Sequence, residues 1–326
     1  MPASEQAFLE CIDRHFPNVA PGVILGRGDD CAILEAPSPG GRLCLSTDLF
    51  VEHQHFRRAY FSPQNIGHKA LAAAASDLAA MGAAPVGFAL SLMISPADDD
   101  AFLDALLSGM AALSSRLGLP LIGGDLSLGP ALALDITVLG KPSPGGRLLR
   151  RGMAQPGDTL VVVGPIGLAR AGLQALEASG RSAIQHWPAA TAAHLSPMPR
   201  IADGQTLAMN TAVRGLMDVS DGLARDVPRF VGRFGAEMNL TAEALHPEVR
   251  EYFAQQGRNA VEEALLGGED YALLAAIAPE GLAQVLSALP EAYVLGHVTE
   301  QPGLRLNGRP FSKAGFDHFS TQEGDE

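Results

Sequence analysis

The sequence predicts an α+β protein of two domains, and three observations support this. The length of 326 residues suits two domains of about 150 residues each. Each half mixes short apolar runs with amphipathic stretches, which favours α+β layers over a strict βαβ array. Between the halves, residues 141–158 are rich in Pro, Gly and Arg, as is typical of a linker. We therefore expect domains of residues 1–148 and 149–326.

The clearest helix of the first half lies in SPQNIGHKALAAAASDLAAMG. Ser62 is a candidate N-cap, Pro63 suits the first turn, and Gly82 stops the helix. A helix over Asp98–Leu117 carries leucines on one side. The other expected elements are a helix over Glu5–His15 and strands at Cys31–Leu34, Leu43–Ser46, Val86–Ile94, Pro120–Ile122 and Ala131–Leu139.

The second half repeats this mixture of elements. Apolar runs predict four strands, at Leu160–Val163, Leu216–Val219, Tyr271–Ile277 and Tyr293–Val298. Two helices are expected, over Leu168–Ala178 and Leu223–Phe234.

Composition and charge exclude several functional classes. The formal net charge of -13 argues against nucleic acid and anionic membrane surfaces as partners. The three cysteines, Cys11, Cys31 and Cys44, form no CxxC pair and fit reduced thiols better than disulfides or a zinc site. The N-terminal segment lacks the pattern of a secretion signal. We expect a cytoplasmic protein.

Acidic residues recur beside glycine or serine at predicted strand ends and loops. Small neighbours let a ligand approach the backbone, and carboxylates and hydroxyls are the hard oxygen ligands that Mg²⁺ prefers. Six such segments in one chain point to a shared metal site. They are GDD (28–30), STD (46–48), SD (76–77), GGD (123–125), DVSD (218–221) and GGED (267–270).

Each acidic residue also has a structural alternative. Asp29 and Asp30 fit a solvated turn. Asp77 fits an exposed position near a helix C-terminus, although the helix dipole disfavours a carboxylate there. Asp221 fits an N-cap for the helix that begins near Leu223. These alternatives stay open at the level of the sequence.

An acidic protein holds polyphosphate through divalent ions, because its carboxylates repel the phosphates directly. The sequence has no GxxxxGK[ST] loop. The GPIG turn (164–167) offers backbone amides to a phosphate, with an ordinary tight turn as the alternative.

Taken in order, GDDCAIL, STDLFVEHQHF, KALAAAASDLAAMGA, IGGDLS, DVSDGL and GGEDYALL closely resemble the thiamine-monophosphate kinase family. That family belongs to the ATP-binding superfamily of aminoimidazole ribonucleotide synthetase and selenophosphate synthetase. The resemblance extends from about Leu25 to Phe319.

The resemblance implies a two-domain aminoimidazole ribonucleotide synthetase-like fold. It has an N-terminal α/β domain that binds ATP and Mg²⁺ and forms a homodimer, and a C-terminal α+β domain that completes the active site. The implied reaction is phosphorylation of thiamine monophosphate by ATP, with several Mg²⁺ ions.

Site residues follow from the matching motifs. The resemblance implies a metal-binding set of Asp30, Ser46, Thr47, Asp48, Asp77, Asp125, Asp218 and Asp221. It implies nucleotide contacts from Gly124, Asp125, Arg151 and Ser220, and thiamine phosphate contacts from His55, Glu269 and Phe316. The residues expected to carry catalysis are Asp30, Asp218, Asp221 and Arg151. Many members of the family have Trp where this chain has Phe316.

The chemistry fits these residue types. A phosphate monoester is mostly dianionic at neutral pH, so no general base is needed and the carboxylates hold ions instead. Arg151 suits bidentate contact with a phosphoryl group, or it is an exposed linker arginine. The aromatic ring of Phe316 could stack on thiamine, with ordinary packing as the alternative. The carboxylate of Glu269 could accept a hydrogen bond from the aminopyrimidine, with a turn carboxylate as the alternative.

The choice between His53 and His55 also stays open from the residues alone. On a strand both would face the same side. The register of the family favours His55.

Two other functions compete. One is a different ATP-using synthetase of the superfamily, which Cys11 argues against because it lies in a helical pattern rather than a glycine-rich segment. The other is a non-catalytic divalent-cation-binding protein, for which no regular calcium loop is present in the sequence.

Overall fold

The computed structural model describes residues 5–17, 20–25, 33–34 and 42–313. Asp30 and Phe316 lie outside the described residues, as does Cys31. The chain forms two compact units. The first comprises Met1–Leu149, Ser179–Ser182 and Leu195–Thr211, and the second comprises Arg150–Ala178, Ala183–His194 and Ala212–Glu326.

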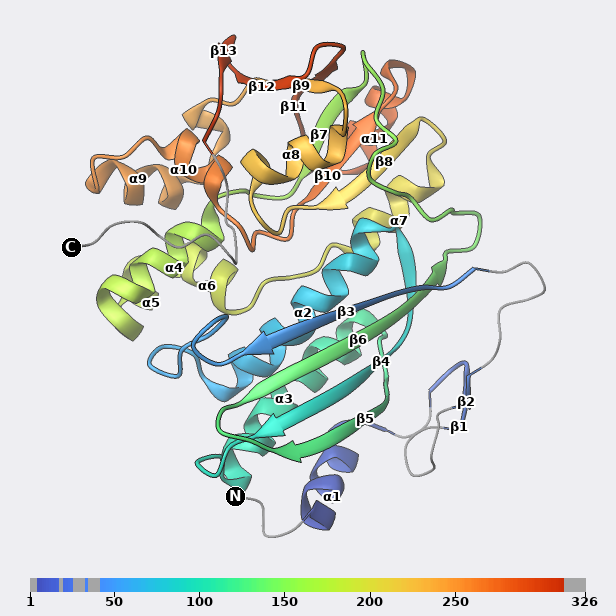
Figure 1. Cartoon of the computed structure of the whole chain (residues 1–326), viewed down its shortest axis with the longest axis vertical. Helices are drawn as coiled ribbons and strands as arrows, with labels where there is room; N and C mark the ends of the chain where they lie inside the picture. The colour runs from blue at the N-terminus through green and yellow to red at the C-terminus, as the bar shows by residue number, and fades with distance from the viewer. Residues whose placement is uncertain (1–4, 18–19, 26–32, 35–41, 314–326) are drawn as a thin grey trace. The chain divides into compact units, whose positions relative to one another are not determined.

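The first unit is built on a four-stranded sheet in the order β3-β6-β4-β5. β6 pairs antiparallel with both β3 and β4, whereas β4 and β5 are parallel. Helices α2 and α3 cover one face of this sheet (Figure 1). The elements of the unit are α1 (Glu5–His15), β1 (Val23–Leu25), β2 (Ile33–Leu34), β3 (Cys44–Val51), α2 (Pro63–Ala80), β4 (Ala83–Ile94), α3 (Asp100–Leu117), β5 (Leu121–Leu128), β6 (Ala133–Pro142) and α7 (Ile201–Met209).

Local capping defines the ends of α2 and α3. Ser62 and Asn65 form a capping box at the start of α2, which confirms the predicted N-cap. Asp99 accepts the amide hydrogen of Phe102 at 2.8 Å and so caps α3. A Cβ atom on Gly67 of α2 would lie 2.1 Å from the carbonyl oxygen of Leu106, so this glycine lets the two helices pack backbone to backbone.

The opposite face of the sheet, which we call the open face, carries exposed apolar side chains. Along β3, Ser46, Asp48 and Phe50 point to the helices, and the alternate residues point away. Leu45 and Leu49 are 64% and 59% exposed. An apolar sheet face of this kind is typical of an interaction surface.

The second unit is built on a seven-stranded sheet in the order β13-β12-β9-β11-β7-β10-β8. Strand β10, which lies between β7 and β8, consists wholly of buried residues, as the continuous apolar run 273–277 predicts. The elements are β7 (Thr159–Val163), α4 (Leu168–Ser179), α5 (Ala183–His186), α6 (Pro188–Leu195), β8 (Val213–Asp218), α8 (Leu223–Val231), β9 (Gly235–Met238), α9 (Pro247–Gln255), α10 (Ala260–Leu266), β10 (Leu273–Ile277), α11 (Leu282–Ala288), β11 (Ala292–Thr299), β12 (Gly303–Leu306) and β13 (Arg309–Pro310).

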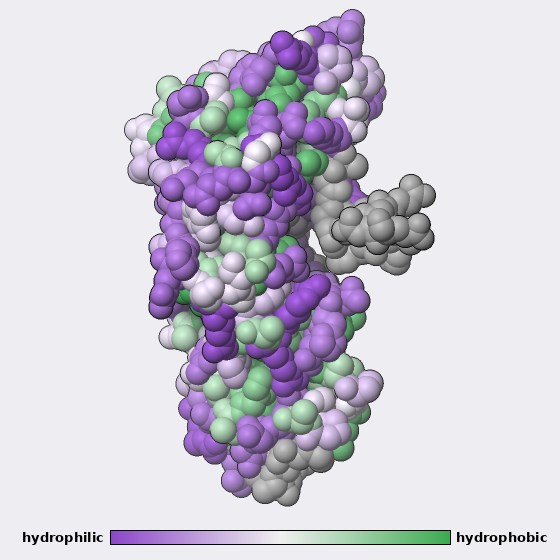
Figure 2. Space-filling view, turned by 90° about the vertical axis from the view of Figure 1, so that its left-hand side faces the viewer, coloured by the Kyte–Doolittle hydropathy of each residue, from purple (hydrophilic) through white to green (hydrophobic). Residues whose placement is uncertain are grey.

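The surface drawn in Figure 2 is mainly hydrophilic, with apolar residues gathered in small patches. Among the described residues, none of the helices combines the length and the apolar character that a membrane span requires.

Candidate functional site

In the first unit, three of the predicted metal-site residues meet between strand β3 and helix α2. Ser46 and Asp48 lie two residues apart on β3 and therefore face the same side. The Ser46 hydroxyl donates a hydrogen bond to the carboxylate of Asp77 on α2. The pKa of Asp48 is raised to about 6, first by burial and then by the negative charges of Asp77 and Asp135. We call Ser46, Asp48 and Asp77 the β3–α2 cluster.

Thr47 lies on the other face of the sheet. Its hydroxyl donates to Asp135 on β6 at 2.7 Å and accepts from Thr137 at 3.1 Å. The sequence analysis did not single out Asp135. The sequence marks Asp135 only as the one carboxylate in the apolar strand ALDITV. By the alternation of side chains along a strand, this position lies on the open face.

Gly124 and Asp125 lie on β5, at the opposite edge of this sheet from β3. Asp125 pairs with Ser91 on β4, which in turn pairs with Asp135 on β6, so Asp125 belongs to the open face. Three strand spacings separate β5 from β3, a distance of about 14 Å. The fold of one chain therefore does not bring Asp125 to Asp48.

The predicted substrate residue His55 sits in a turn rather than on a strand. β3 ends at Val51, and a bridge between Glu52 and Phe56 closes the turn. The His55 ring stacks on Phe50 with centroids 5.5 Å apart, and its Nδ1 accepts the amide hydrogen of Val51 at 3.0 Å. The expectation that His53 and His55 face the same side of a strand is thus wrong.

The two histidines differ in their surroundings. His53 is exposed and has a φ of 69°, in the left-handed region, whereas His55 is held by an aromatic ring and by the backbone. The turn itself therefore distinguishes two residues that the sequence alone leaves equivalent.

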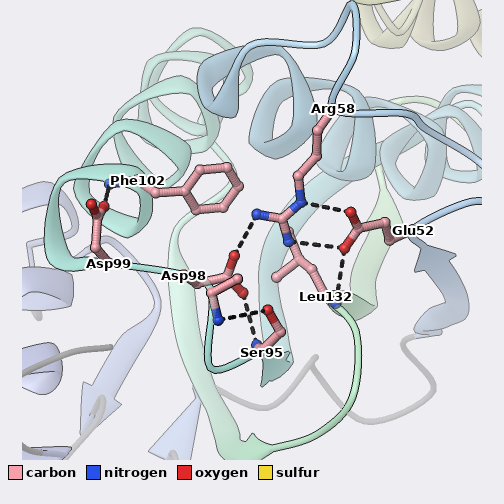
Figure 3. A network of polar contacts seen from close by, with 8 residues as sticks. Glu52, Arg58, Ser95, Asp98, Asp99, Phe102 and Leu132 are labelled. Carbon is pink, nitrogen blue, oxygen red and sulfur yellow. Dashed lines mark hydrogen bonds and ion pairs between the residues drawn. The ribbon is translucent and has the colours of Figure 1, made fainter.

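A polar network fixes the base of this turn (Figure 3). Arg58 donates to both carboxylate oxygens of Glu52, at 2.6 and 2.8 Å, and to Asp98 at 2.5 Å. Its guanidinium also lies 4.5 Å from the ring centroid of Phe102. Glu52 accepts the amide hydrogen of Leu132 as well, at 3.3 Å. The network ties the turn that carries His55 to the loop that follows β4 and to the loop that precedes β6.

In the second unit, the DVSDG segment connects β8 to α8. Asp218 ends β8 in a buried position. The two residues that begin the turn are held by Asp226, whose Oδ2 accepts the amide hydrogens of Ser220 at 3.1 Å and Asp221 at 3.0 Å. Burial raises the pKa of Asp226 to about 6. Asp226 is a second residue that the sequence analysis missed, because a carboxylate inside a helix has no distinctive pattern.

The alternative role of Asp221 as a helix N-cap is wrong. Gly222, with a φ of 95°, occupies the N-cap position of α8 and provides no side-chain bond. Asp221 instead forms ion pairs with Arg229 and, at 3.7 Å, with Arg225. Its side chain is therefore oriented by two arginines of α8.

The GGED segment packs against the DVSDG turn within this unit. The amide of Glu269 donates to the carbonyl oxygen of Ser220 at 2.8 Å. Its carboxylate lies 3.3 Å from Nδ1 of His194, a buried residue of α6. Glu269 has a φ of 65°, so its backbone conformation is fixed by these contacts.

Asp270 holds the GPIG turn. Its carboxylate accepts the amide hydrogens of Gly167 at 2.6 Å and Ala169 at 3.0 Å. Burial raises the pKa of Asp270 to about 7. These two amides therefore already donate to a carboxylate of the protein itself.

Arg151 is an exposed residue beside β8 and α8. The carbonyl oxygen of Arg150 accepts from Leu216 at 3.4 Å, and Gly152 donates to the carbonyl oxygen of Phe230 at 3.1 Å. The backbone on both sides of Arg151 is thereby anchored, while its side chain reaches into solvent.

The chain matches two known domain families. Residues 28–141 match the AIR synthase related protein, N-terminal domain, and residues 155–309 match the AIR synthase related protein, C-terminal domain. A thiamine-monophosphate kinase from Synechococcus elongatus is 38% identical over 307 residues, covering 90% of this chain and 92% of that protein.

Solved structures give the same result. The thiamine-monophosphate kinase of Stenotrophomonas maltophilia superposes with a TM-score of 0.81 at 29% identity, over 94% of this chain and 98% of that one. AaThiL complexed with AMPPCP and TMP superposes with a TM-score of 0.78 at 25% identity, over 97% of both chains. These matches extend over most of the chain and over both units of the fold. The chain therefore belongs to the thiamine-monophosphate kinase family.

Proposed function

We propose that the protein transfers the terminal phosphoryl group of ATP to thiamine monophosphate, yielding ADP and thiamine diphosphate. The observation that carries the proposal is the β3–α2 cluster. Two carboxylates and a hydroxyl meet there, and mutual repulsion helps to raise the pKa of Asp48 to about 6. A divalent cation relieves such repulsion, and the donor set of hard oxygens is the one that Mg²⁺ prefers.

The proposed metal ligands include the three residues of this cluster. They are Asp30, Ser46, Thr47, Asp48, Asp77, Asp125, Asp218 and Asp221. Bound Mg²⁺ would neutralise the phosphates and allow two anionic substrates to meet. The protein's own contribution is to fix the carboxylates, as Asp226 does for Asp221 through its backbone.

The remaining residues bind and orient the substrates. The proposed nucleotide contacts are Gly124, Asp125, Arg151 and Ser220. The anchored backbone around Arg151 suits a directed guanidinium. His55 and Glu269 are proposed thiamine phosphate contacts, and both side chains are held in place by neighbours. Phe316 completes this proposed set. The acceptor phosphate needs no base, because it is already largely ionised at neutral pH.

A homodimer is part of the proposal. The open sheet face exposes Leu45 and Leu49 and carries Thr47 and Asp125. In one chain, three strand spacings of about 14 Å in total separate Asp125 from strand β3. A second copy seated on this face would bring its own Asp125 toward Thr47, which shares the face. We further propose a cytoplasmic location, with ATP and thiamine monophosphate rather than nucleic acid or membrane as partners.

One experiment tests the activity and its rivals together. The protein is incubated with ATP, Mg²⁺ and thiamine monophosphate, and ADP and thiamine diphosphate are quantified. We expect equal amounts of both products, and no turnover in Asp218→Asn or Asp30→Asn variants that remain folded. Asp203→Asn, which removes a carboxylate paired with Arg200 on α7, is the matched control. ADP without thiamine diphosphate would favour another synthetase, and neither product would favour a cation-binding protein.

A further inference from the structure

A second group of metal-ligand side chains lies in the first unit, on helices α1 and α3, which carry none of the proposed active-site residues. Cys11 and His15 are four residues apart on α1 and therefore share one face of that helix. Asp104 faces them from α3. Its Oδ1 lies 3.4 Å from the Cys11 Sγ and 3.0 Å from the His15 Nε2. The three ligand atoms all lie within 4.8 Å of one another.

These separations match the edges of a small coordination polyhedron. With bonds of about 2.3 Å to sulfur, about 2.0 Å to nitrogen and about 2.0 Å to oxygen, a tetrahedral zinc site has ligand-to-ligand edges of about 3.3–3.6 Å. The observed separations from Asp104 to the other two ligands are within about 0.3 Å of that range. Side-chain rotation alone can therefore admit the ion.

Charge and accessibility also suit Zn²⁺. A Cys thiolate and an Asp carboxylate balance the two charges of the ion, and a neutral imidazole completes a sulfur, nitrogen and oxygen set that Mg²⁺ does not favour. Cys11 is buried, whereas the Asp104 side chain is 48% exposed, so a water molecule can reach the fourth position. His15 also lines a cavity of about 720 Å³, which opens a second approach.

Arg14 forms an ion pair with this carboxylate. Its Nη2 lies 3.4 Å from the Oδ1 of Asp104, and its side chain is 61% exposed. An exposed pair of this kind contributes little to stability, and the long arginine side chain can move to the second carboxylate oxygen. Asp100, which also acts on Cys11 electrostatically, adds negative charge that favours a bound cation.

We propose that Cys11, His15 and Asp104 bind one Zn²⁺ ion, with water as the fourth ligand, and that the ion clamps α1 onto α3. On binding, the thiol proton that now points to Asp104 leaves to solvent and the thiolate becomes the ligand. No oxidation or reduction occurs. The proposal is independent of the kinase activity, because none of the three residues belongs to the proposed active site.

Cobalt(II) provides a specific probe, since only a thiolate ligand gives an intense near-ultraviolet sulfur-to-cobalt charge-transfer band. The titration is performed on the full-length protein in excess Mg²⁺, which occupies the oxygen-only sites. We expect one equivalent of Co²⁺ to produce the band, and one equivalent of Zn²⁺ to abolish it by displacement. Cys11→Ser should abolish the band, whereas Cys44→Ser, which changes a half-buried cysteine of β3, should leave it unchanged.

Two further readouts separate a metal site from a simple hydrogen-bonded cluster. The first is affinity: Asp104→Asn should weaken Co²⁺ binding at least tenfold. The second is thermal stability: removal of the metal by a chelator should lower the melting temperature of the wild type but not that of Cys11→Ser. The absence of a charge-transfer band at stoichiometric Co²⁺ would overturn the proposal. So would a band that survives in Cys11→Ser. Thiamine diphosphate formation is measured separately. It tests the proposed kinase function independently of whether the metal site exists.

Discussion

The carboxylate of Asp270 accepts a hydrogen bond of 2.6 Å from the backbone amide of Gly167, a residue 103 positions earlier in the chain. Together with the bond to Ala169, this contact closes the turn between β7 and α4 from the segment that carries Glu269. Because Asp270 is buried, its pKa in the folded protein rises from 3.8 to about 7. The burial of Asp270, which outweighs the opposite effect of the two hydrogen bonds on its pKa, therefore makes the stability of the second unit depend on pH.

The sign of this dependence is unusual for an aspartate. Between pH 4 and pH 7 the folded state holds a proton that the unfolded state has lost, so the contribution of Asp270 becomes less favourable as pH rises. We expect Asp270→Asn to be more destabilising at pH 5 than at pH 8. Denaturant unfolding of both proteins at the two pH values measures the difference. An equal loss of unfolding free energy at both values would contradict the raised pKa.

The second prediction concerns Asp226 and the DVSDG turn. Asp226→Ala leaves the amides of Ser220 and Asp221 without their acceptor, at a cost of about 1–3 kcal/mol in unfolding free energy. Since the turn would lose its order, we expect at least a tenfold loss of turnover and a higher Mg²⁺ requirement. Asp226→Asn keeps an acceptor oxygen and should retain more activity. Steady-state kinetics at several Mg²⁺ concentrations test this, and equal activity of the two variants would contradict it.

Local signals explain which parts of the fold were predictable. The capping box at Ser62, Pro63 in the first turn and Gly82 after the last define α2, and all three act within a few residues. Short elements such as α5 and β13 have too few residues to show a period, and the sequence analysis missed them. β5 runs past the predicted Ile122 because glycines interrupt the apolar pattern.

The candidate site was predictable to the extent that its residues share short motifs. The resemblance places Ser46, Thr47 and Asp48 in one metal-binding set, whereas in the structure Thr47 faces away from the other two. The roles of Asp135 and Asp226 depend instead on which backbone groups and strands the fold brings beside them. Such partners are set by tertiary contacts, which a single sequence does not reveal.

The third prediction concerns Mg²⁺ binding at the β3–α2 cluster. Asp48 has a pKa of about 6 and must lose its proton to act as a ligand, so Mg²⁺ affinity should fall as pH decreases through 6. Calorimetric titration of Mg²⁺ at pH 5 and pH 7.5 measures the change, and Asp48→Asn should reduce the pH dependence. Asp77→Asn removes a neighbouring negative charge and should lower the pKa of Asp48, which NMR of the carboxyl carbon reports. An unchanged Asp48 titration would show that the two carboxylates are not coupled.

The fourth prediction concerns Arg58 as a positioning residue for His55. Arg58 bridges Glu52, at the base of the His55 turn, to Asp98, which is fully buried. Arg58→Lys keeps the positive charge but cannot make both contacts with Glu52 and the contact with Asp98 at once, because an ammonium lacks the planar fork of a guanidinium. The turn should then become mobile, while the proposed nucleotide contacts, none of which bonds to Arg58, stay intact. We expect the KM for thiamine monophosphate to rise about tenfold and the KM for ATP to stay within about twofold.

A matched variant separates positioning from a general loss of stability. Arg305→Lys changes an exposed arginine of β12 that pairs with Glu237, and it should alter neither KM. His55→Ala in the Arg58→Lys background provides the decisive comparison. If Arg58 acts through His55, removal of His55 should raise the KM for thiamine monophosphate much less in the Arg58→Lys protein than in the wild type. Fully additive effects would mean that the network stabilises the first unit without orienting His55.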